Sequence, residues 1–413
     1  MATLSNTVLD LPINPIRFLT PIIEKKEKEG VSFYKLNIGQ PDIDTDPEIL
    51  NAIRKIVSKE DYKVIKYSSA NGLYPTRKAW AEGYYEGVIS PDGVVVTNGS
   101  SEGMLLAYYA MLNPGDSNLV FSPLYPNYEA YAHISGRRLV VLSRDVKQGY
   151  PLPPVEDIES AIVSDGKVKV VTLISPDNPT GYVYSEAEIE SIYSLAEKYD
   201  IWVVVDEAYR DIRFNPETKP IFDVVRDKKN YMNRTLFLST VSKEYSACGI
   251  RMGALCSTNL ELIKGLTRLT MPRLSTNEIA QLAICEVLHK KRSERGKVML
   301  EYKSRRDVVI SALRKMGISV VEPQGALYVL PDMSTVGITD TFKFSKWLVE
   351  DYYVEMEDGS KKSIVVAPGS GFYPQTATFR SNSMIRIAYV LNSEDLEKAM
   401  DILAKAVEKY RKL

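Results

Sequence analysis

Short runs of apolar, largely β-branched residues alternate along the chain with longer segments in which apolar residues recur at helical spacing. The runs lie at residues 94–97, 118–121, 168–174, 201–205 and 235–240. Such runs are typical of strands buried on both faces, and an intervening segment such as 186–200, with Ser185 as its cap, is typical of an amphipathic helix. The alternation predicts a mainly parallel sheet that lies between helices on both faces.

The pattern changes toward the end of the chain, where long helical segments precede short strand-like ones. Helices are expected at 277–290, 296–316, 342–351 and 393–410, and short strands at 318–321, 326–330, 364–367 and 384–390. Helices mixed with short strands in this way are typical of an α+β arrangement. We therefore expect an α/β protein with a second, smaller α+β domain, a division that a length of 413 residues also favours.

Composition and charge add exclusions to this picture. Lysine plus arginine total 52 against 53 for aspartate plus glutamate, a net charge of -1, and no long basic stripe occurs, so we expect no nucleic-acid partner. The first residues lack a charged start leading into an apolar segment, and no apolar run reaches the ~18 residues that a bilayer requires. We expect a soluble, cytoplasmic protein with no membrane partner.

Cysteine and histidine are too few and too scattered for most metal chemistry. The three cysteines, Cys248, Cys256 and Cys285, lack CxxC spacing, which argues against a zinc site and against a disulfide framework. Because only two histidines exist, His133 and His289, a multi-histidine metal centre is excluded, and a Ser-His-Asp triad would need one of these two. We expect no metal.

Polar residues directly follow four of the predicted strands. In chain order they are Gly99 with Ser100, Asn178, Asp206, and the residues from Thr240 to Lys243. Ligands of open parallel sheets bind at the carboxyl ends of the strands, so these four loops are expected to converge. The first loop joins a strand to a helix through small residues, a geometry that directs free backbone N–H groups at an anion. The sequence therefore predicts one site with an anion-binding end, an amide, a carboxylate and a lysine.

The stretch STVSKEYSACGIRMG at 239–253 carries the most reactive candidate. Lys243 follows an apolar run, and desolvation with neighbouring cations favours the neutral amine, which can form a Schiff base with an aldehyde. Arg251 supplies a fixed positive charge for an anionic group on that aldehyde. Taken alone, such a pair is more often a surface lysine beside a salt-bridged arginine. Convergence with the other three loops favours a reactive lysine.

Four motifs together carry a resemblance to a known family. They are NPTG at 178–181, DEAY at 206–209, SKEYSACGIRMG at 242–253 and IRIAYV at 385–390. In their order and spacing the chain resembles the class I/II aminotransferases of the aspartate aminotransferase superfamily, the fold type I pyridoxal-phosphate enzymes, over nearly its whole length. The resemblance implies a large cofactor-binding domain at 46–295 with a mainly parallel, seven-stranded sheet. It also implies a small domain at 296–413, to which the segment 1–45 contributes.

The same resemblance implies roles around pyridoxal 5′-phosphate. Lys243 resembles the lysine that forms an aldimine with the cofactor and then moves the proton of the substrate α-carbon. Asp206 is similar to the carboxylate that keeps the pyridine nitrogen protonated, which makes the ring an electron sink. Asn178 and Tyr209 resemble the donors to the ring hydroxylate, and Tyr125 matches the aromatic residue that stacks on the ring.

Phosphate and substrate residues are implied in the same way. The phosphate residues are Gly99, Ser100, Ser101, Thr240 and Arg251. Tyr67 matches a tyrosine that reaches the phosphate of the other subunit, which implies a homodimer with shared active sites. The implied substrate residues are Gly39, Asn178 and Arg386, and Arg386 resembles the arginine that binds the α-carboxylate as a bidentate pair.

The activity implied is transfer of an amino group from an L-amino acid to a 2-oxo acid by a ping-pong mechanism. The alternative on the same fold is another pyridoxal-phosphate reaction, such as a β-lyase acting on cystathionine or cysteine S-conjugates. A ligand-sensing regulator of this fold is disfavoured, because no basic recognition helix is found.

The preferred amino acid stays open at this stage. Relatives specific for dicarboxylates carry an arginine four residues before a serine, and if Ser275 is that serine the position holds Met271. Arg273, the nearest arginine, is out of register. Aspartate-like and aromatic substrates are therefore both expected to be possible.

Overall fold

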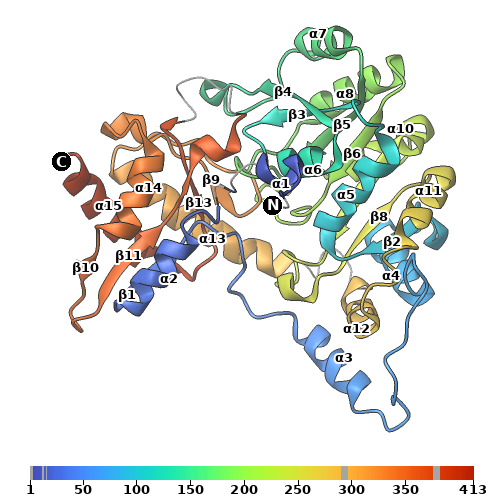
Figure 1. Ribbon diagram of the computed structural model, residues 1–413, viewed down its shortest axis with the longest axis horizontal. Helices are drawn as coiled ribbons and strands as arrows, with labels where there is room; N and C mark the ends of the chain where they lie inside the picture. The colour runs from blue at the N-terminus through green and yellow to red at the C-terminus, as the bar shows by residue number, and fades with distance from the viewer. Residues whose placement is uncertain (1–2, 12–13, 15, 290–295, 375–381) are drawn as a thin grey trace.

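A seven-stranded sheet forms the centre of the larger part of the molecule, shown in the computed structural model of Figure 1. The model describes residues 3–11, 14, 16–289, 296–374 and 382–413. The strand order is β2-β8-β7-β6-β5-β3-β4, and only β8 runs antiparallel to its neighbours. The strands span Val94–Thr97 (β2), Ser117–Ser122 (β3), Arg138–Ser143 (β4), Val168–Ile174 (β5), Trp202–Asp206 (β6), Thr235–Thr240 (β7) and Gly253–Cys256 (β8). The prediction of a mainly parallel sheet is confirmed.

Side chains of each strand alternate between two apolar layers, one on either face of this sheet. In β2, for example, Val94 and Val96 pack into one layer and Val95 into the other. The first layer is closed by α4 (Tyr74–Tyr85), α8 (Glu186–Lys198) and α12 (Glu278–Leu288), and the second by α5 (Gly99–Met111), α6 (Asn127–Ser135) and α11 (Leu260–Thr270). Helices therefore cover both faces, as the uninterrupted apolar strands predict.

Further helices complete this part of the chain. They are α3 (Pro47–Val57), α7 (Val155–Asp165), α9 (Ile221–Val225) and α10 (Lys229–Asn233). Helix α3 begins where the sequence suggests, because the Asp46 side chain accepts a hydrogen bond from the Glu48 N–H and Pro47 occupies the first helical position.

Two small three-stranded sheets form the second region, at the left of Figure 1. In one, β1 (Val31–Lys35) pairs in parallel with β11 (Lys361–Val365), which pairs antiparallel with β10 (Val354–Glu355). In the other, β13 (Ile385–Ala388) lies between β12 (Ala367–Pro368) and β9 (Tyr328–Val329). The helices of this region are α2 (Thr20–Lys28), α13 (Gly296–Lys315), α14 (Thr341–Glu350) and α15 (Ser393–Tyr410).

The pairing of β1 with β11 builds an N-terminal strand into a sheet of C-terminal residues. The exact boundaries at residues 46 and 296 stay predictions. One expected strand is wrong: residues 318–321 contribute only an isolated bridge from Ser319 to Asp332, because no neighbouring strand offers a continuous edge there.

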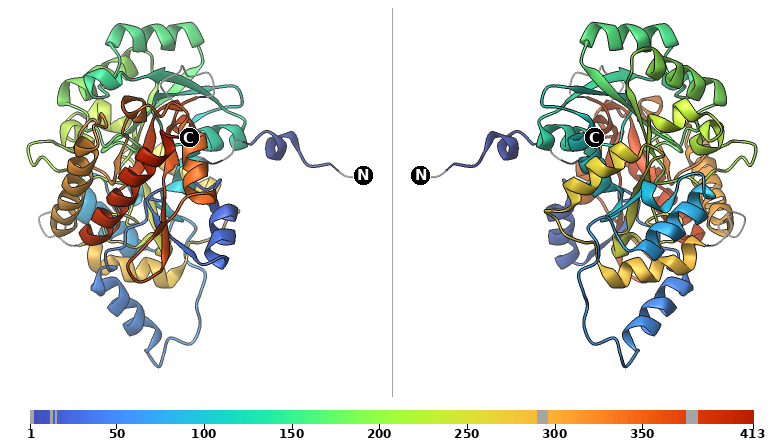
Figure 2. Two further views of the ribbon diagram at one scale, coloured as in Figure 1. Left: turned by 90° about the vertical axis from the view of Figure 1, so that its left-hand side faces the viewer. Right: turned by 90° about the vertical axis from the view of Figure 1, so that its right-hand side faces the viewer.

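Two segments project from the body of the molecule in Figure 2. The first carries α1 (Asn6–Leu9), and in this segment the side chains of Leu4, Val8 and Leu9 are exposed. The second is α3 with the loop that follows it, where Val64 and Ile65 are exposed and Tyr67 is 82% exposed. Among the described residues, no helix combines the length and the apolar character needed to cross a membrane.

Candidate functional site

A cavity of about 520 Å³ opens at the carboxyl ends of β5, β6 and β7, beside the second region. The residues expected in the site that line it are Gly39, Ser100, Ser101, Tyr125, Asn178, Asp206, Tyr209, Thr240, Lys243, Arg251 and Arg386. Gly99 lies directly behind the wall, against the Arg251 side chain. Tyr67 does not line the cavity of its own chain. Loops from four strands therefore converge on one hollow, as the position of their polar residues suggests.

Lys243 follows β7 and lies at the cavity wall. Its Nζ donates a hydrogen bond to the Gly39 carbonyl at 2.6 Å and lies 3.6 Å from Cys248 Sγ. A side chain at Gly39 is not tolerated, since a Cβ there would lie 1.8 Å from the Tyr328 hydroxyl oxygen. The next residue, Glu244, is buried; it accepts hydrogen bonds from the Tyr84 hydroxyl and, at 2.8 Å, from the Asp211 N–H. These contacts fix the backbone that carries the lysine.

Asp206 ends β6 and points its carboxylate into the cavity. Oδ2 accepts a hydrogen bond from the Tyr128 hydroxyl at 2.8 Å, and Oδ1 accepts one from the Ala208 N–H at 3.1 Å. Burial raises the pKa of Asp206 to about 6, while these two hydrogen bonds act in the opposite direction. No cation of the described residues offsets the burial. The ionised carboxylate is therefore ready to pair with a cationic group of a ligand.

Arg386 lies on β13 at the opposite wall and is only 1% exposed. Nη1 donates to Asn178 Oδ1 at 3.1 Å and Nη2 donates to the Asn37 carbonyl at 2.5 Å, while the guanidinium lies 4.3 Å and 4.8 Å from the ring centroids of Tyr328 and Phe372. Burial lowers its pKa, and no carboxylate of the described residues contributes to its surroundings. A buried guanidinium between two rings is suited to a carboxylate that arrives with a ligand.

Two buried tyrosines, Tyr209 and Tyr328, also line the cavity. The hydroxyls of Tyr209 and Tyr328 lie 2.8 Å apart, and both side chains are buried. The ring of Tyr125 meets that of Tyr128 edge to face at 5.6 Å, and its hydroxyl accepts a hydrogen bond from Asn127 Nδ2. The cavity therefore offers a flat aromatic surface beside polar hydroxyl groups.

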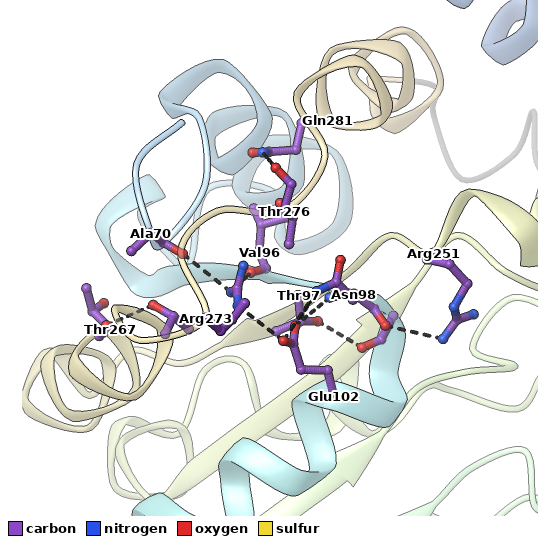
Figure 3. Close-up of polar contacts among 12 residues, drawn as sticks. Ala70, Val96, Thr97, Asn98, Glu102, Arg251, Thr267, Arg273, Thr276 and Gln281 are labelled. Carbon is purple, nitrogen blue, oxygen red and sulfur yellow. Dashed lines mark hydrogen bonds and ion pairs between the residues drawn. The ribbon is translucent and has the colours of Figure 1, made fainter. Parts of the chain in front are cut away.

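The anion site, as we call the first turn of α5 at Gly99–Ser101 with Thr240 and Arg251, lies at one end of the cavity. Gly99 has a φ of +76°, and a Cβ there would lie 2.6 Å from Arg251 Nη2. The guanidinium of Arg251 donates to the Asn98 carbonyl at 3.2 Å (Figure 3) and to the Cys248 carbonyl at 3.1 Å. A helix N-terminus beside an arginine and hydroxyl groups is suited to a phosphate.

Several residues at the cavity were missed from the sequence. Tyr128 and Tyr131 lie on α6, the helix that follows β3, so their only signal in the sequence is a tyrosine-rich segment after the run at 118–121. Tyr328 and the N-terminal residues Ile16 and Arg17 reach the cavity through the tertiary fold, and no local pattern marks them. In the described parts of the chain no three or more His, Cys, Asp or Glu side chains are grouped as a metal would require.

Comparisons with known proteins agree with this geometry. Residues 32–403 match the family model of aminotransferase class I and II. The aspartate aminotransferase of Thermotoga maritima is 29% identical over 402 residues, which are 96% of this chain and 97% of that protein. The aspartate/prephenate aminotransferase of Thermus thermophilus is 28% identical over 387 residues, 92% of each chain.

A solved structure gives the same result in three dimensions. That of the aspartate aminotransferase of Thermus thermophilus with maleate matches with a TM-score of 0.84 and 26% identity, covering 98% of this chain and 100% of that one. Since the family model spans most of the sequence and the fold matches throughout, the chain belongs to the class I and II aminotransferases.

Proposed function

We propose that this aminotransferase holds pyridoxal 5′-phosphate in the cavity and moves an amino group from an L-amino acid to a 2-oxo acid in two alternating half-reactions. One observation carries the proposal: a lysine amine, a buried acid without a cation and an anion site face the same cavity. The cofactor needs these three partners, for its aldehyde, its ring nitrogen and its phosphate. When bound, it supplies a carbon that accepts the amine and a ring that delocalises an electron pair.

Lys243 is proposed to attach the cofactor and to move the proton at the substrate α-carbon. Its Nζ lies at the wall, and Glu244 anchors the backbone that carries it, so the amine stays at the cavity after the substrate releases it. A base held in place removes a proton far more effectively than one that must diffuse.

Asp206 is proposed to hold the positive charge of the ring nitrogen, and Tyr128 to orient Asp206. Asn178 and Tyr209 are proposed to donate to the ring hydroxylate, and Tyr125 to stack on the ring. The anion site, with Ser100, Ser101, Thr240 and Arg251, is proposed to bind the phosphate. Fixed dipoles and charges of this kind need no reorganisation during the reaction.

Substrate binding is proposed at the other end of the cavity. Arg386 would take the α-carboxylate as a bidentate pair, beside Gly39 and Asn178. Its lack of a carboxylate among the described residues supports this role, because a buried guanidinium is costly until an anion pairs with it.

The protein is proposed to prefer substrates with an acidic side chain, and Arg17 is proposed to bind the carboxylate of that side chain. Neither Met271 nor Arg273 lines the cavity, whereas the exposed Arg17 does. Arg17 thus supplies a charge for a distal carboxylate at the mouth of the cavity, from the N-terminal segment. The solved Thermus thermophilus relative with maleate is consistent with this choice.

A homodimer in the cytoplasm is proposed as the working form. Tyr67 is exposed, in a projecting loop with exposed Val64 and Ile65, and is proposed to reach the phosphate of a second copy. All three cysteines are free, which is consistent with a reducing compartment. Sedimentation of the loaded protein tests the dimer, and mixing Tyr67→Phe with Lys243→Ala chains tests the sharing of sites.

The decisive experiment follows the cofactor itself. Protein loaded with pyridoxal 5′-phosphate should show a visible absorption band that borohydride abolishes, and mass spectrometry should then locate the cofactor on Lys243. A loaded protein without the band, or with the label on another lysine, contradicts the proposal. Amino acids are next screened for loss of the band. Pyruvate released from cysteine or cystathionine, with no such loss from any amino acid, would favour the β-lyase.

A further inference from the structure

We propose that Arg273 is a positioning residue, which sets the phosphate affinity of the anion site through Glu102 in the first turn of α5. The proposal rests on the proposed function, because it assumes that the anion site binds the cofactor phosphate. Arg273 itself does not line the cavity. It acts on the turn that precedes α5, from the side of this turn that faces away from the cavity.

The Arg273 side chain joins three segments that are far apart in sequence (Figure 3). Nε lies 3.1 Å from Glu102 Oε1, and Nη2 donates to the Val96 carbonyl at 2.9 Å and to the Ala70 carbonyl at 3.4 Å. The side chain is 17% exposed. Arg273 therefore connects the end of β2, the loop that also carries Tyr67, and the start of α5.

Glu102 transmits this contact to the turn before the helix. Its Oε2 accepts a hydrogen bond from the Asn98 N–H at 2.6 Å, so the carboxylate caps the turn at 97–99. Arg251 holds the same residue from the cavity side, by donating to the Asn98 carbonyl at 3.2 Å. The peptide groups of Asn98 are thus held between Glu102, which Arg273 contacts, and Arg251, and with them the direction of the N–H groups of Gly99–Ser101.

Charge gives Arg273 a second effect on the anion site. Glu102 places a negative charge in the first turn of α5, and the N-terminus of this helix is proposed to bind a phosphate. The two negative charges repel each other. Arg273 offsets this charge from the side away from the cavity. Without it, the negative charge of Glu102 would oppose the phosphate with no cation beside it to offset that charge.

A purely structural role makes a different prediction. If Arg273 only connects the loop at 66–72 to β2, its loss lowers the stability of the chain, and any loss of phosphate affinity comes through Tyr67 and is not restored by changing Glu102. If it positions the anion site, its loss weakens phosphate-bearing ligands selectively, and removing the Glu102 charge restores part of the affinity. Pyridoxal, which lacks the phosphate, and Glu102→Gln together separate the two cases.

The experiment compares Arg273→Met with wild type and with Arg234→Met as a matched control. Arg234 also bonds two backbone carbonyls, of Ala196 and Ile201, and lies 3.6 Å from Asp200, but it is remote from the cavity. Dissociation constants for pyridoxal 5′-phosphate and for pyridoxal are measured by titrating the apoprotein, together with the ³¹P chemical shift of the loaded protein and the Tm of the apoprotein.

Arg273→Met is expected to weaken pyridoxal 5′-phosphate about tenfold, to leave pyridoxal within twofold and to shift the ³¹P resonance, as loss of a charge-assisted contact predicts. Arg234→Met should lower Tm without changing either constant. Adding Glu102→Gln to Arg273→Met should restore part of the affinity, since the opposing charge is removed. Equal weakening of both ligands, or a change in Tm alone, overturns the proposal.

Arg273→Lys covers the case in which the methionine variant does not fold. It keeps the charge but cannot hold Glu102 and the Val96 carbonyl together, so a severalfold loss specific to the phosphate ligand is expected; unchanged affinity overturns the proposal. A wild-type protein that does not bind pyridoxal 5′-phosphate would instead refute the proposed function. The two failures are therefore distinguishable.

Discussion

The two ends of the cavity are built in different ways. At the cofactor end, Asp206 is the last residue of β6, Thr240 is the last residue of β7 and Lys243 follows β7, and the parallel pairing of these two strands holds them side by side. At the substrate end, Arg17 comes from the N-terminal segment and Arg386 from a small antiparallel sheet of the second region. The first end is fixed by one sheet, and the second depends on how separate parts of the chain pack together.

This difference suggests that the two ends of the cavity have different functions. A sheet edge with backbone register holds its groups without further support, which suits a cofactor that stays through every turnover. An end assembled from distant segments can change its side chains without disturbing the sheet, which suits selection among substrates. The predictions below test whether the cofactor end carries the chemistry and the substrate end the selectivity.

Replacing Lys243 with alanine should have the largest effect, because it removes both the proposed attachment and the proposed base. We expect kcat to fall about 10⁴-fold or more, the contribution of a well-placed base. The comparison with wild type is made by single-turnover absorbance with cofactor in excess. Retention of cofactor by the variant, through the anion site, is the control; activity within tenfold of wild type contradicts the role.

Replacing Arg386 with glutamine should have the second largest effect on activity. Losing a buried bidentate partner of the α-carboxylate is expected to lower kcat/KM on the order of 10²- to 10³-fold for every amino acid, whatever its side chain. Steady-state kinetics on an acidic and an apolar substrate check this. The cofactor should stay bound and keep a visible absorption band, which shifts only as far as Asn178, the hydrogen-bond partner of Arg386, is displaced; a lost band would show that the two ends are not separable.

Asp206 predicts a pH dependence of stability in the protein without cofactor. Its pKa of about 6 lies above the ordinary value of about 3.9, so its contribution to the free energy of unfolding is complete below pH ~4 and lost as pH rises through 6. The loss amounts to about 3 kcal/mol, from roughly two pKa units at 1.4 kcal/mol each.

Urea unfolding of wild type and Asp206→Asn between pH 4 and 7 measures this term. The neutral amide does not titrate, so the difference in free energy of unfolding between the two proteins should change by about 3 kcal/mol across the range. Wild type should become less stable relative to Asp206→Asn as the pH rises. A difference in free energy of unfolding that does not change with pH would mean that burial does not raise the pKa of Asp206.

The same contrast between the two ends explains how much could be predicted from the sequence. Strand runs with a polar residue at their end are local signals, and they located Asn178, Asp206 and Lys243 together with the sheet. Tyr128 lies on α6, beyond the loop after β3 and among many tyrosines, so its hydrogen bond to Asp206 was not predicted. The expected strand at 318–321 was wrong, because an apolar run alone does not supply a pairing edge.

Residues of the substrate end lack such signals. Tyr328 and Arg17 reach the cavity only when the second region and the N-terminal segment pack against the sheet. Arg273 is a further case: in the sequence it is only an arginine out of register with the dicarboxylate-binding position, and the fold turns it toward Glu102. Long-range packing, which depends on the whole chain, decides these positions.

Replacing Arg17 with methionine should give the smallest and most selective effect. An exposed charge pair is worth about 1 kcal/mol, so kcat/KM for aspartate or glutamate should fall roughly 5- to 10-fold. For alanine or phenylalanine it should stay within twofold, because these substrates have no distal carboxylate. Arg17→Lys keeps the charge and should retain most of the acidic preference, and added salt should reduce the wild-type preference in the same direction. An equal loss for all substrates would show that Arg17 shapes the cavity as a whole, and the division between a cofactor end and a selective substrate end would then fail at this residue.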